Sequence, residues 1–361
     1  MIVSNVYRLA TLDALRGIAA VGVVLYHFTS LFATKFNHPE LSSLFPEASS
    51  HIGRYGVELF FIISGFVISM SIENSNNVYR FFVSRFSRLF PTFWAAVFIS
   101  SVFIWAFNGQ FDVTIFLKNL TMIPNFIGAK NIDGSYWTLT YELFFYIAIA
   151  TLFYFFKTIP TKLMIVIGIG VSLLTVLVSI FDAYLGYKVK ALLLIPHIHL
   201  FLGGFLFYKL WNSNYLKPTH TWIIYLVLFF LVLVQWLLVE SDYSRHNFTS
   251  SIMVTAFFLI MVLVTKEKLS FLSHPILVYF GTISYSLYLI HQEVGYIFIN
   301  QLVNFTGSYW LSMPLSLAGV ILIADLMYRY IESPSNKIVK RYLMLFQKNK
   351  VEKNVRNTRN T

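Results

Sequence analysis

The chain has 361 residues, of which 57% are hydrophobic, 18% aromatic and only 12% charged. So few polar side chains cannot coat a water-soluble globule of this size, which excludes a soluble protein and indicates an integral membrane protein. The net charge is +11, but many lysines and arginines follow Ile331 and most others lie between apolar runs. An anionic membrane surface is therefore the expected partner, and no nucleic acid is expected.

Ten apolar windows predict an all-α, polytopic integral membrane protein with about ten transmembrane helices. Lysine and arginine are in excess in alternate connections, which predicts that both termini are cytoplasmic. Residues 1–331 form one transmembrane domain, followed by a basic cytoplasmic tail, 332–361. The predicted spans are Thr11–Phe32, Tyr55–Ile72, Leu89–Phe107, Trp137–Phe156, Leu163–Phe181, Ala191–Leu210, Thr221–Val239, Phe248–Val264, Ile276–Val303 and Tyr309–Ile331.

The first span carries two side chains that are costly inside a bilayer, Arg16 and His27. They lie 11 residues apart, which in an α-helix is close to three full turns and about 16 Å of rise, so we expect both on one face. This pairing suits a site that binds an anion and carries out proton chemistry deeper in. The alternatives are a structural imidazole satisfied by a neighbouring polar group, and an arginine neutralised by Asp13.

Two glutamates lie inside later spans. Glu58 lies just inside the second span, where it either belongs to a site or reaches the outer surface. Glu142, in GSYWTLTYELFFY, lies about one and a half turns into the fourth span. That depth is too great for a short side chain to reach water, so a carboxylate there indicates function.

The stretch YRFFVSRFSRLFP is predicted as a cytoplasmic connection between the second and third spans, with Pro91 opening the third. Its arginines match the ordinary excess of positive charge on the inner side. Arg85 and Arg88, however, are three residues apart, so on a helix both guanidinium groups project from one side. Such a pair can hold a phosphate through bidentate hydrogen bonds, and we favour an anionic ligand.

The remaining buried polar residues are less informative. His197 and His199 point about 200° apart on a helix, which is poor geometry for a shared metal, and no metal site is predicted. His291 lies near the middle of the ninth span, where a functional and a structural role are equally supported. Asp325 and Arg329 are four residues apart and are expected to neutralise each other.

The sequence contains no GxSxG, HExxH, GxGxxG or glycine-rich phosphate loop, so the serine hydrolase, zinc protease and nucleotide hydrolase interpretations lack support. Two non-enzymatic interpretations stay open from the residues alone. One is a transporter or flippase of a lipid-linked sugar without acyl-transfer chemistry, which ten spans with buried charges would suit. The other is a membrane scaffold, which leaves Arg16, His27 and Glu142 without a role.

Six segments follow one another along nearly the whole chain: LDALRGIAAVGVVLYHF, GVELFFIISGFVIS, SRFSRLFPTFW, GSYWTLTYELFFY, SYSLYLIH and IESP. In this order they resemble the membrane-bound acyltransferase family 3, which includes bacterial O-acetyltransferases of surface polysaccharides. The resemblance implies an acyltransferase, with residues 1–331 as its domain. It implies transfer of an acyl group, acetyl in the first instance, from cytoplasmic acyl-coenzyme A to a hydroxyl of a sugar or lipid-linked saccharide. It implies a multi-pass protein of the cell (inner or plasma) membrane with no permanently bound cofactor.

The resemblance also implies roles for single residues. His27 matches the essential histidine of the family, and the residues implied at the coenzyme are Arg16, Arg85 and Arg88. The chain has Ser84 where the family often has the first residue of a basic doublet.

A mechanism follows as a hypothesis. His27 is the general base that takes the proton of the attacking hydroxyl, since imidazole titrates nearest to neutral pH. Glu142, or Glu58 as second choice, orients His27, which requires the first and fourth spans to pack together. The residues expected to contact the acceptor are Trp137, Tyr141 and His291.

Overall fold

The computed structural model describes residues 2–36, 51–75, 77–157, 159–181, 187–195, 197–212, 218–238, 248–342 and 344–345. These residues are helical or irregular, with no β-strand among them, which confirms the predicted all-α class. The α-helices are α1 (Ile2–Tyr26), α2 (Phe32–Lys35), α5 (Gly56–Glu73), α6 (Val78–Asn108), α7 (Val113–Asn119), α8 (Trp137–Phe156), α9 (Thr161–Phe181), α10 (Tyr187–Leu192), α11 (Ile198–Trp211), α12 (Pro218–Leu237), α13 (Phe248–Thr265), α14 (Pro275–Ile290), α15 (Glu293–Thr306) and α16 (Tyr309–Met327).

Within the described part of the chain, eight helical segments are long and apolar enough to cross a membrane, and they coincide with eight of the ten predicted spans. The sixth and ninth predicted spans correspond to shorter apolar helices, α11 and α14. The ninth span is not one helix as predicted, because the chain turns at His291 and Gln292 before α15 begins. The side of the membrane on which the termini lie stays a prediction.

The third span differs from its predicted form. The arginine stretch is the first part of α6 and not a connection, since the helix starts at Val78, where the Asn77 side chain accepts a hydrogen bond from the Arg80 backbone N–H at 2.9 Å. Pro91 lies inside this helix and does not open it. A proline is tolerated within a membrane helix because neighbouring groups satisfy the backbone carbonyl that it frees.

The last helix also runs past its predicted end. A π-helical turn, Tyr328–Glu332, follows α16, and the helical segment continues to Tyr342, so the first part of the predicted tail is helical. Asp325 and Arg329 form the expected ion pair, with 2.7 Å between carboxylate oxygen and Nε. Residues 346–361 of the tail lie outside the described residues.

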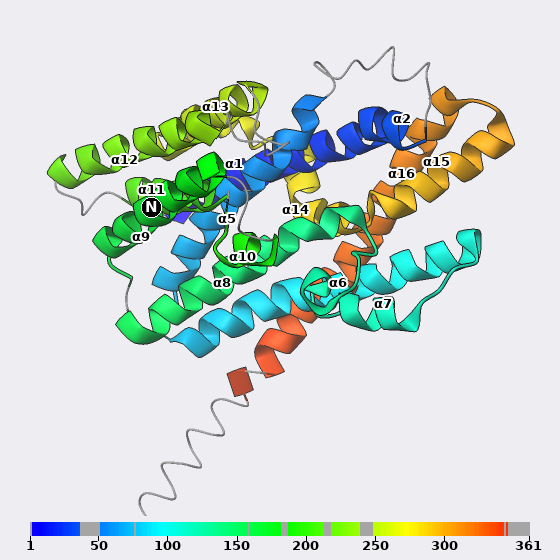
Figure 1. Ribbon diagram of the computed structural model, residues 1–361, viewed down its shortest axis with the longest axis horizontal. Coiled ribbons are helices and arrows are strands. Elements are labelled where there is room, and N and C mark those ends of the chain that lie inside the picture. The colour runs from blue at the N-terminus through cyan, green and yellow to red at the C-terminus, as the bar shows by residue number, and fades with distance from the viewer. Residues whose placement is uncertain are drawn as a thin grey trace, which may run out of the picture.

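Figure 1 shows how the helices surround α1 and α5, which cross the middle of the bundle. The helices α12 and α13 lie at one edge, α6 and α7 lie at the opposite edge, and α15 with α16 forms one end. The most extensive helix contacts join α1 to α14 and α5 to α11. Glycines allow the second contact, because a Cβ on Gly65 or Gly204 would overlap the backbone of the facing helix.

Candidate active site

Two glycines bring α1 and α14 together along the line that leads to the site. A Cβ on Gly17 would collide with the α14 backbone near Gly281, and a Cβ on Gly281 would collide with the α1 backbone at Asp13. Thr11 and Ser273 share a hydrogen bond of 3.0 Å before this crossing. Both helices run in the same direction, so ten residues beyond each glycine the chain reaches His27 and His291, respectively.

His27 and His291 are in direct contact. The Nε2 atom of His291 lies 3.2 Å from Nδ1 of His27, and the ring centroids are 4.7 Å apart with the planes nearly perpendicular. His291 is 0% exposed. The sequence placed both histidines inside the membrane. Their contact depends on the parallel packing of α1 and α14, which the spacing of residues within either helix could not predict.

Two nearby backbone carbonyls show which ring nitrogen of each histidine carries the proton when both rings are neutral. The Nδ1 atom of His291 lies 2.8 Å from the Tyr288 carbonyl, which only accepts, so this nitrogen carries the proton and Nε2 of His291 is an acceptor. The Nδ1 atom of His27 lies 2.8 Å from the Val23 carbonyl and faces that acceptor nitrogen. His27 Nδ1 therefore carries its proton, which makes Nε2 the basic nitrogen of His27.

A π-helical turn begins at His27 and ends at Leu31. The wider turn moves backbone carbonyls out of the regular α-helical pattern, and the Tyr309 hydroxyl, at the start of α16, donates to the Phe28 carbonyl. The Phe28 side chain is fully buried against Gly295 of α15, where a Cβ would overlap the phenyl ring. The turn that carries His27 is thus held from α15 and α16.

His27 lines a cavity of about 420 Å³, which we name the histidine cavity. Its lining is half polar and comes from the end of α1, the start of α5, the residues before α8, and the break between α14 and α15. The aromatic and polar lining residues are Tyr26, His27, Arg54, Glu58, Ser135, Trp137, Tyr288 and Gln292. A mixed aromatic and hydrogen-bonding wall of this kind suits a polar molecule with an apolar face.

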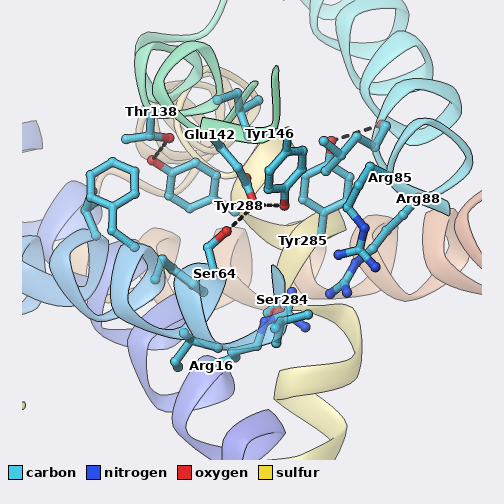
Figure 2. A pocket seen from close by; sticks show the side chains of 17 residues that line it. Arg16, Ser64, Arg85, Arg88, Thr138, Glu142, Tyr146, Ser284, Tyr285 and Tyr288 are labelled. Atoms are coloured by element: carbon cyan, nitrogen blue, oxygen red, sulfur yellow. Dashed lines mark hydrogen bonds between the residues drawn. The ribbon is translucent and has the colours of Figure 1, made fainter. Parts of the chain in front are cut away.

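A second, smaller cavity of about 80 Å³, the arginine cavity, lies beside it (Figure 2). It brings together four of the charged residues that the sequence analysis singled out, since Arg16 of α1, Arg85 and Arg88 of α6 and Glu142 of α8 all line it. The other polar lining residues are Ser64, Thr138, Tyr146, Ser284, Tyr285 and Tyr288. The prediction that Arg85 and Arg88 project from one side of a helix agrees with this arrangement.

The arginine cavity carries an excess of positive charge. Arg16 pairs with Asp13 at 3.8 Å, as the sequence suggested, while Arg85 and Arg88 form no ion pair within the described residues. Glu142 is the one carboxylate on the wall that the structure describes, and it accepts hydrogen bonds from Ser64, at 3.0 Å, and from Tyr146. Three guanidinium groups facing one hydrogen-bonded carboxylate suit a multiply charged anion such as a phosphate.

The predicted pairing of Glu142 with His27 is wrong. The two side chains line different cavities, and α8 packs on α5 and α6 while α1 packs on α14 and α5, so the first and fourth spans are not close neighbours. The reason is depth along α8. Glu142 follows Trp137 by five residues, about 7.5 Å of helix, and Trp137 is the residue of α8 at the level of His27. The neighbour of the His27 ring is His291.

The other predicted site residues divide between the cavity and the core. Glu58 and Trp137 line the histidine cavity with His27. Tyr141 does not face it as predicted, because its hydroxyl donates to the Ile195 carbonyl at 3.3 Å and its ring packs against His197. His291 was predicted to contact the acceptor, and the structure instead places it behind His27.

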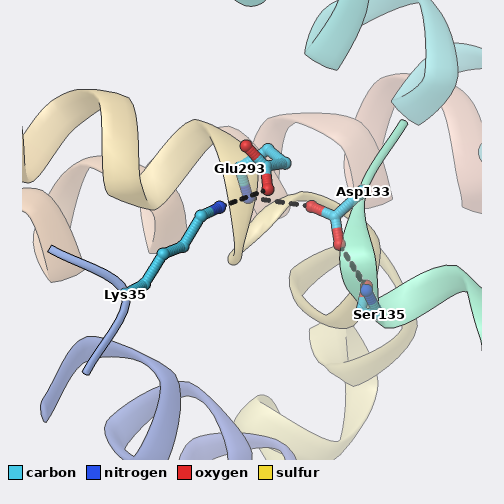
Figure 3. A network of polar contacts seen from close by, with 4 residues as sticks. All are labelled: Lys35, Asp133, Ser135 and Glu293. Atoms are coloured by element: carbon cyan, nitrogen blue, oxygen red, sulfur yellow. Dashed lines mark hydrogen bonds and ion pairs between the residues drawn. The ribbon is translucent and has the colours of Figure 1, made fainter. Parts of the chain in front are cut away.

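A buried carboxylate that the sequence analysis missed holds the entrance to α8 and the break after α14 (Figure 3). Asp133 is 0% exposed and accepts from the Ser135 N–H and hydroxyl and, at 2.9 Å, from the Glu293 backbone N–H. Glu293 in turn accepts from Lys35 at 3.0 Å. Burial raises the pKa of the Asp133 carboxyl above its usual 3.8, although these hydrogen bonds and Lys35 act in the opposite direction.

This network positions two residues of the histidine cavity, Ser135 and Gln292, which the sequence analysis did not name. Ser64 and Tyr146, the partners of Glu142, were missed as well. Asp133, in the string NIDGSYW, is a typical cap before a helix, and that pattern was the available signal. Hydroxyl groups in apolar spans are too common to have indicated the other two.

Several curated proteins are similar in sequence to this chain. Among curated proteins, nodulation protein 10 of Rhizobium leguminosarum is 24% identical over 311 residues, covering 78% of this chain and 82% of that protein. A putative acetyltransferase, ORF330, of Acidianus two-tailed virus is 23% identical over 77% of this chain and 80% of its own. The peptidoglycan O-acetyltransferase OatA of Listeria monocytogenes is 26% identical over 91% of this chain but 56% of its own length.

No solved structure matches the chain. The model of acyltransferase family 3, described as an acyltransferase domain, matches residues 9–329, a range that contains every residue lining the two cavities. With most of its length matched and its apolar helices in place, the chain belongs to this acyltransferase family, as a multi-pass membrane enzyme.

Proposed function

We propose that this enzyme transfers an acetyl group from acetyl-coenzyme A to a hydroxyl of a saccharide. The observation that carries the proposal is the adjacency of two unlike cavities, one lined by three arginines and one lined by His27, whose linings share Val57 and Tyr288. A reaction between an anionic donor and a neutral hydroxyl requires two such compartments. Family membership and relatives named as O-acetyltransferases support transfer over the transporter interpretation.

The donor is assigned to the arginine cavity by its charge. Coenzyme A carries phosphates, and the guanidinium groups of Arg85 and Arg88 offer planar pairs of donors to them. The cavity volume of about 80 Å³ corresponds to a single phosphate-sized group, so the remainder of the coenzyme lies outside it. Arg16, farther along the wall and paired with Asp13, meets a second anionic or carbonyl oxygen of the same molecule.

The acceptor is assigned to the histidine cavity by its size and lining. A volume of about 420 Å³ lies within the range of small-molecule sites. Trp137 offers an aromatic face for the apolar side of a sugar ring, while Gln292 and Glu58 offer hydrogen-bonding groups for its hydroxyls. One relative is named for peptidoglycan, a saccharide polymer, which supports a carbohydrate acceptor here.

The histidine pair supplies the base. A hydroxyl near Nε2 of His27 gives up its proton to this nitrogen as its oxygen attacks the thioester carbonyl carbon. The C–S bond breaks, an ester C–O bond forms, and the proton passes from His27 to the departing thiolate. During the step the imidazolium of His27 is stabilised by the Val23 carbonyl and Nε2 of His291, both of which accept from its Nδ1.

The test is direct transfer by the purified protein in lipid vesicles. Acetyl-coenzyme A labelled in the acetyl group is added with a saccharide extract of the native cell envelope, and label is followed into alkali-labile ester. We expect labelled ester with the unaltered protein and none above background with His27→Ala. Equal label with both proteins, or no label in saccharide with either, would contradict the proposal.

A further inference from the structure

Two residues, Val57 and Tyr288, belong to the linings of both cavities and so lie between them. Tyr288 lies on α14, three residues before His291, and its ring packs edge-on against Phe60, with 5.7 Å between centroids. An acyl group that passes from the arginine cavity to His27 would therefore pass beside Val57 and Tyr288.

Hydrogen bonds to α8 and to the turn before it hold the Tyr288 ring in place. Its hydroxyl lies 2.9 Å from Oγ1 of Thr138, which lines the arginine cavity (Figure 2). It also donates to the carbonyl of Ser135, which lines the histidine cavity, at 3.2 Å. A buried tyrosine hydroxyl bonded on both sides of the wall has a strong preference for this orientation.

The backbone of Tyr288 is held separately from its side chain. Its carbonyl accepts from Nδ1 of His291 at 2.8 Å and from the Ser135 hydroxyl at 3.2 Å. The ring itself packs against the His291 ring, with 5.5 Å between the centroids. Rotation of the Tyr288 side chain would break this contact and those of its hydroxyl, but not the hydrogen bond from Nδ1 of His291 to the Tyr288 carbonyl, which fixes the tautomer of His291.

We propose that Tyr288 is the positioning residue that separates donor from acceptor, and that its bond to Thr138 keeps water of the histidine cavity away from the thioester until an acceptor is bound. This inference rests on the proposed function. In this role Tyr288 sets the ratio of acetyl transfer to hydrolysis of the thioester, a property distinct from donor binding and from proton transfer.

The competing reaction defines the measurement. If water takes the place of the sugar hydroxyl, its oxygen forms the new bond to the carbonyl carbon and the C–S bond breaks. One proton of water passes through His27 to the thiolate, and the products are acetate, a second proton released to solvent, and free coenzyme A thiol. Release of thiol without acceptor therefore reports how often water reaches the thioester.

The experiment compares thiol release by the purified protein, in vesicles, with acetyl-coenzyme A alone and with acceptor added. Thr138→Val and Tyr288→Phe each remove the bond between the two hydroxyls while keeping side-chain volume. Thr140→Val is the matched control, because Thr140 is buried on the same helix and donates to the Met122 carbonyl at 2.9 Å outside both linings.

We expect acceptor-free thiol release to rise about fivefold in Thr138→Val and in Tyr288→Phe, as loss of one net hydrogen bond allows, and to stay unchanged in Thr140→Val. The double variant should release no more thiol than Tyr288→Phe alone, because both changes remove the same hydrogen bond between the Thr138 and Tyr288 hydroxyls. Unchanged release in both single variants, with transfer intact, would overturn the role of Tyr288. Absence of any thiol release or transfer by the unaltered protein would instead overturn the proposed function.

Discussion

The two cavities share walls from α1, α5, α8 and α14, yet they differ in almost every physical property. The arginine cavity is small, about 80 Å³, and its permanent charges come from helices far apart in the sequence. The histidine cavity is larger, about 420 Å³, and holds titratable rings beside a tryptophan and an amide. The first suits an anion held in a fixed position, and the second suits exchange of a bulky polar molecule and movement of a proton.

One helical segment contributes to both cavities. Arg16 and His27 lie on α1 and on the π-helical turn that follows it, and each faces a different cavity. Substitutions in the two cavities should therefore affect different kinetic constants. Alterations at His27 are expected to lower kcat, and alterations at the arginines are expected to raise KM for the donor.

The largest effect is expected from His27→Ala, because removal of a general base costs between about 10² and 10⁴ in rate. We expect kcat for transfer to fall about 10³-fold while KM for acetyl-coenzyme A stays near its original value. Steady-state kinetics on the purified protein measures both. His220→Ala, at an exposed position on α12, is the control, and near-normal transfer by His27→Ala would reduce His27 to a structural residue.

The next largest effect is expected from the double change Arg85→Ala with Arg88→Ala. Loss of two charge-assisted contacts should raise KM for acetyl-coenzyme A about 100-fold, and the double Lys variant should recover only part of this because an ammonium group lacks the planar fork. Arg80→Ala, at an exposed position on the same helix, should leave KM unchanged. Equal KM values for the Ala and Lys variants would mean that these charges serve only membrane orientation.

A smaller effect distinguishes His291, which contacts His27 in the structure, from Glu142, which was predicted to do so. His291→Gln should lower kcat about tenfold and move its pH profile, since His291 contacts the ring that titrates. Glu142→Gln should leave the pH profile in place and act on KM for the donor, because its contacts are Ser64 and Tyr146. A shift of the profile in Glu142→Gln with none in His291→Gln would reverse this assignment.

The smallest effect concerns Asp133, whose pKa burial raises above 3.8. The folded protein then binds this proton more tightly than the unfolded chain, so the contribution of Asp133 to stability falls as pH rises from about 4 through the raised pKa. Asparagine does not titrate, and the difference in Tm between the unaltered protein and Asp133→Asn should shrink by a few degrees across that interval. A difference in Tm that grows with pH for Asp133→Asn would contradict the prediction.

Helical spacing and depth predicted properties of single helices, but not which charged side chains would meet, since Glu142 was expected beside His27. The three-residue interval between Arg85 and Arg88 and the depth of Glu142 follow from the rise and turn of an α-helix, and all three line one cavity with Arg16. These quantities depend on a single helix or on its position in the bilayer. They can therefore be predicted from the sequence.

Contacts between helices were not predictable in the same way. An apolar helix has no marked polar face, so periodicity did not show that α14, rather than α8, packs against α1 and supplies the partner of His27. The break at His291 and Gln292 has no proline or glycine within it to indicate a helix end. It depends instead on Asp133, a residue far away in the chain that accepts from the first N–H group of α15.

The crossing of α1 and α14 at Gly17 and Gly281 acts as a fulcrum for the histidine pair. The imidazoles lie ten residues beyond the crossing on both helices, a lever arm of about 15 Å, so a tilt of about 5° at the glycines would displace one ring against the other by about 1 Å. That displacement is comparable with the misplacement that costs enzymes about a hundredfold in rate. A single methyl group added at Gly281, remote from both substrates, would thus slow the reaction by tilting one helix against the other.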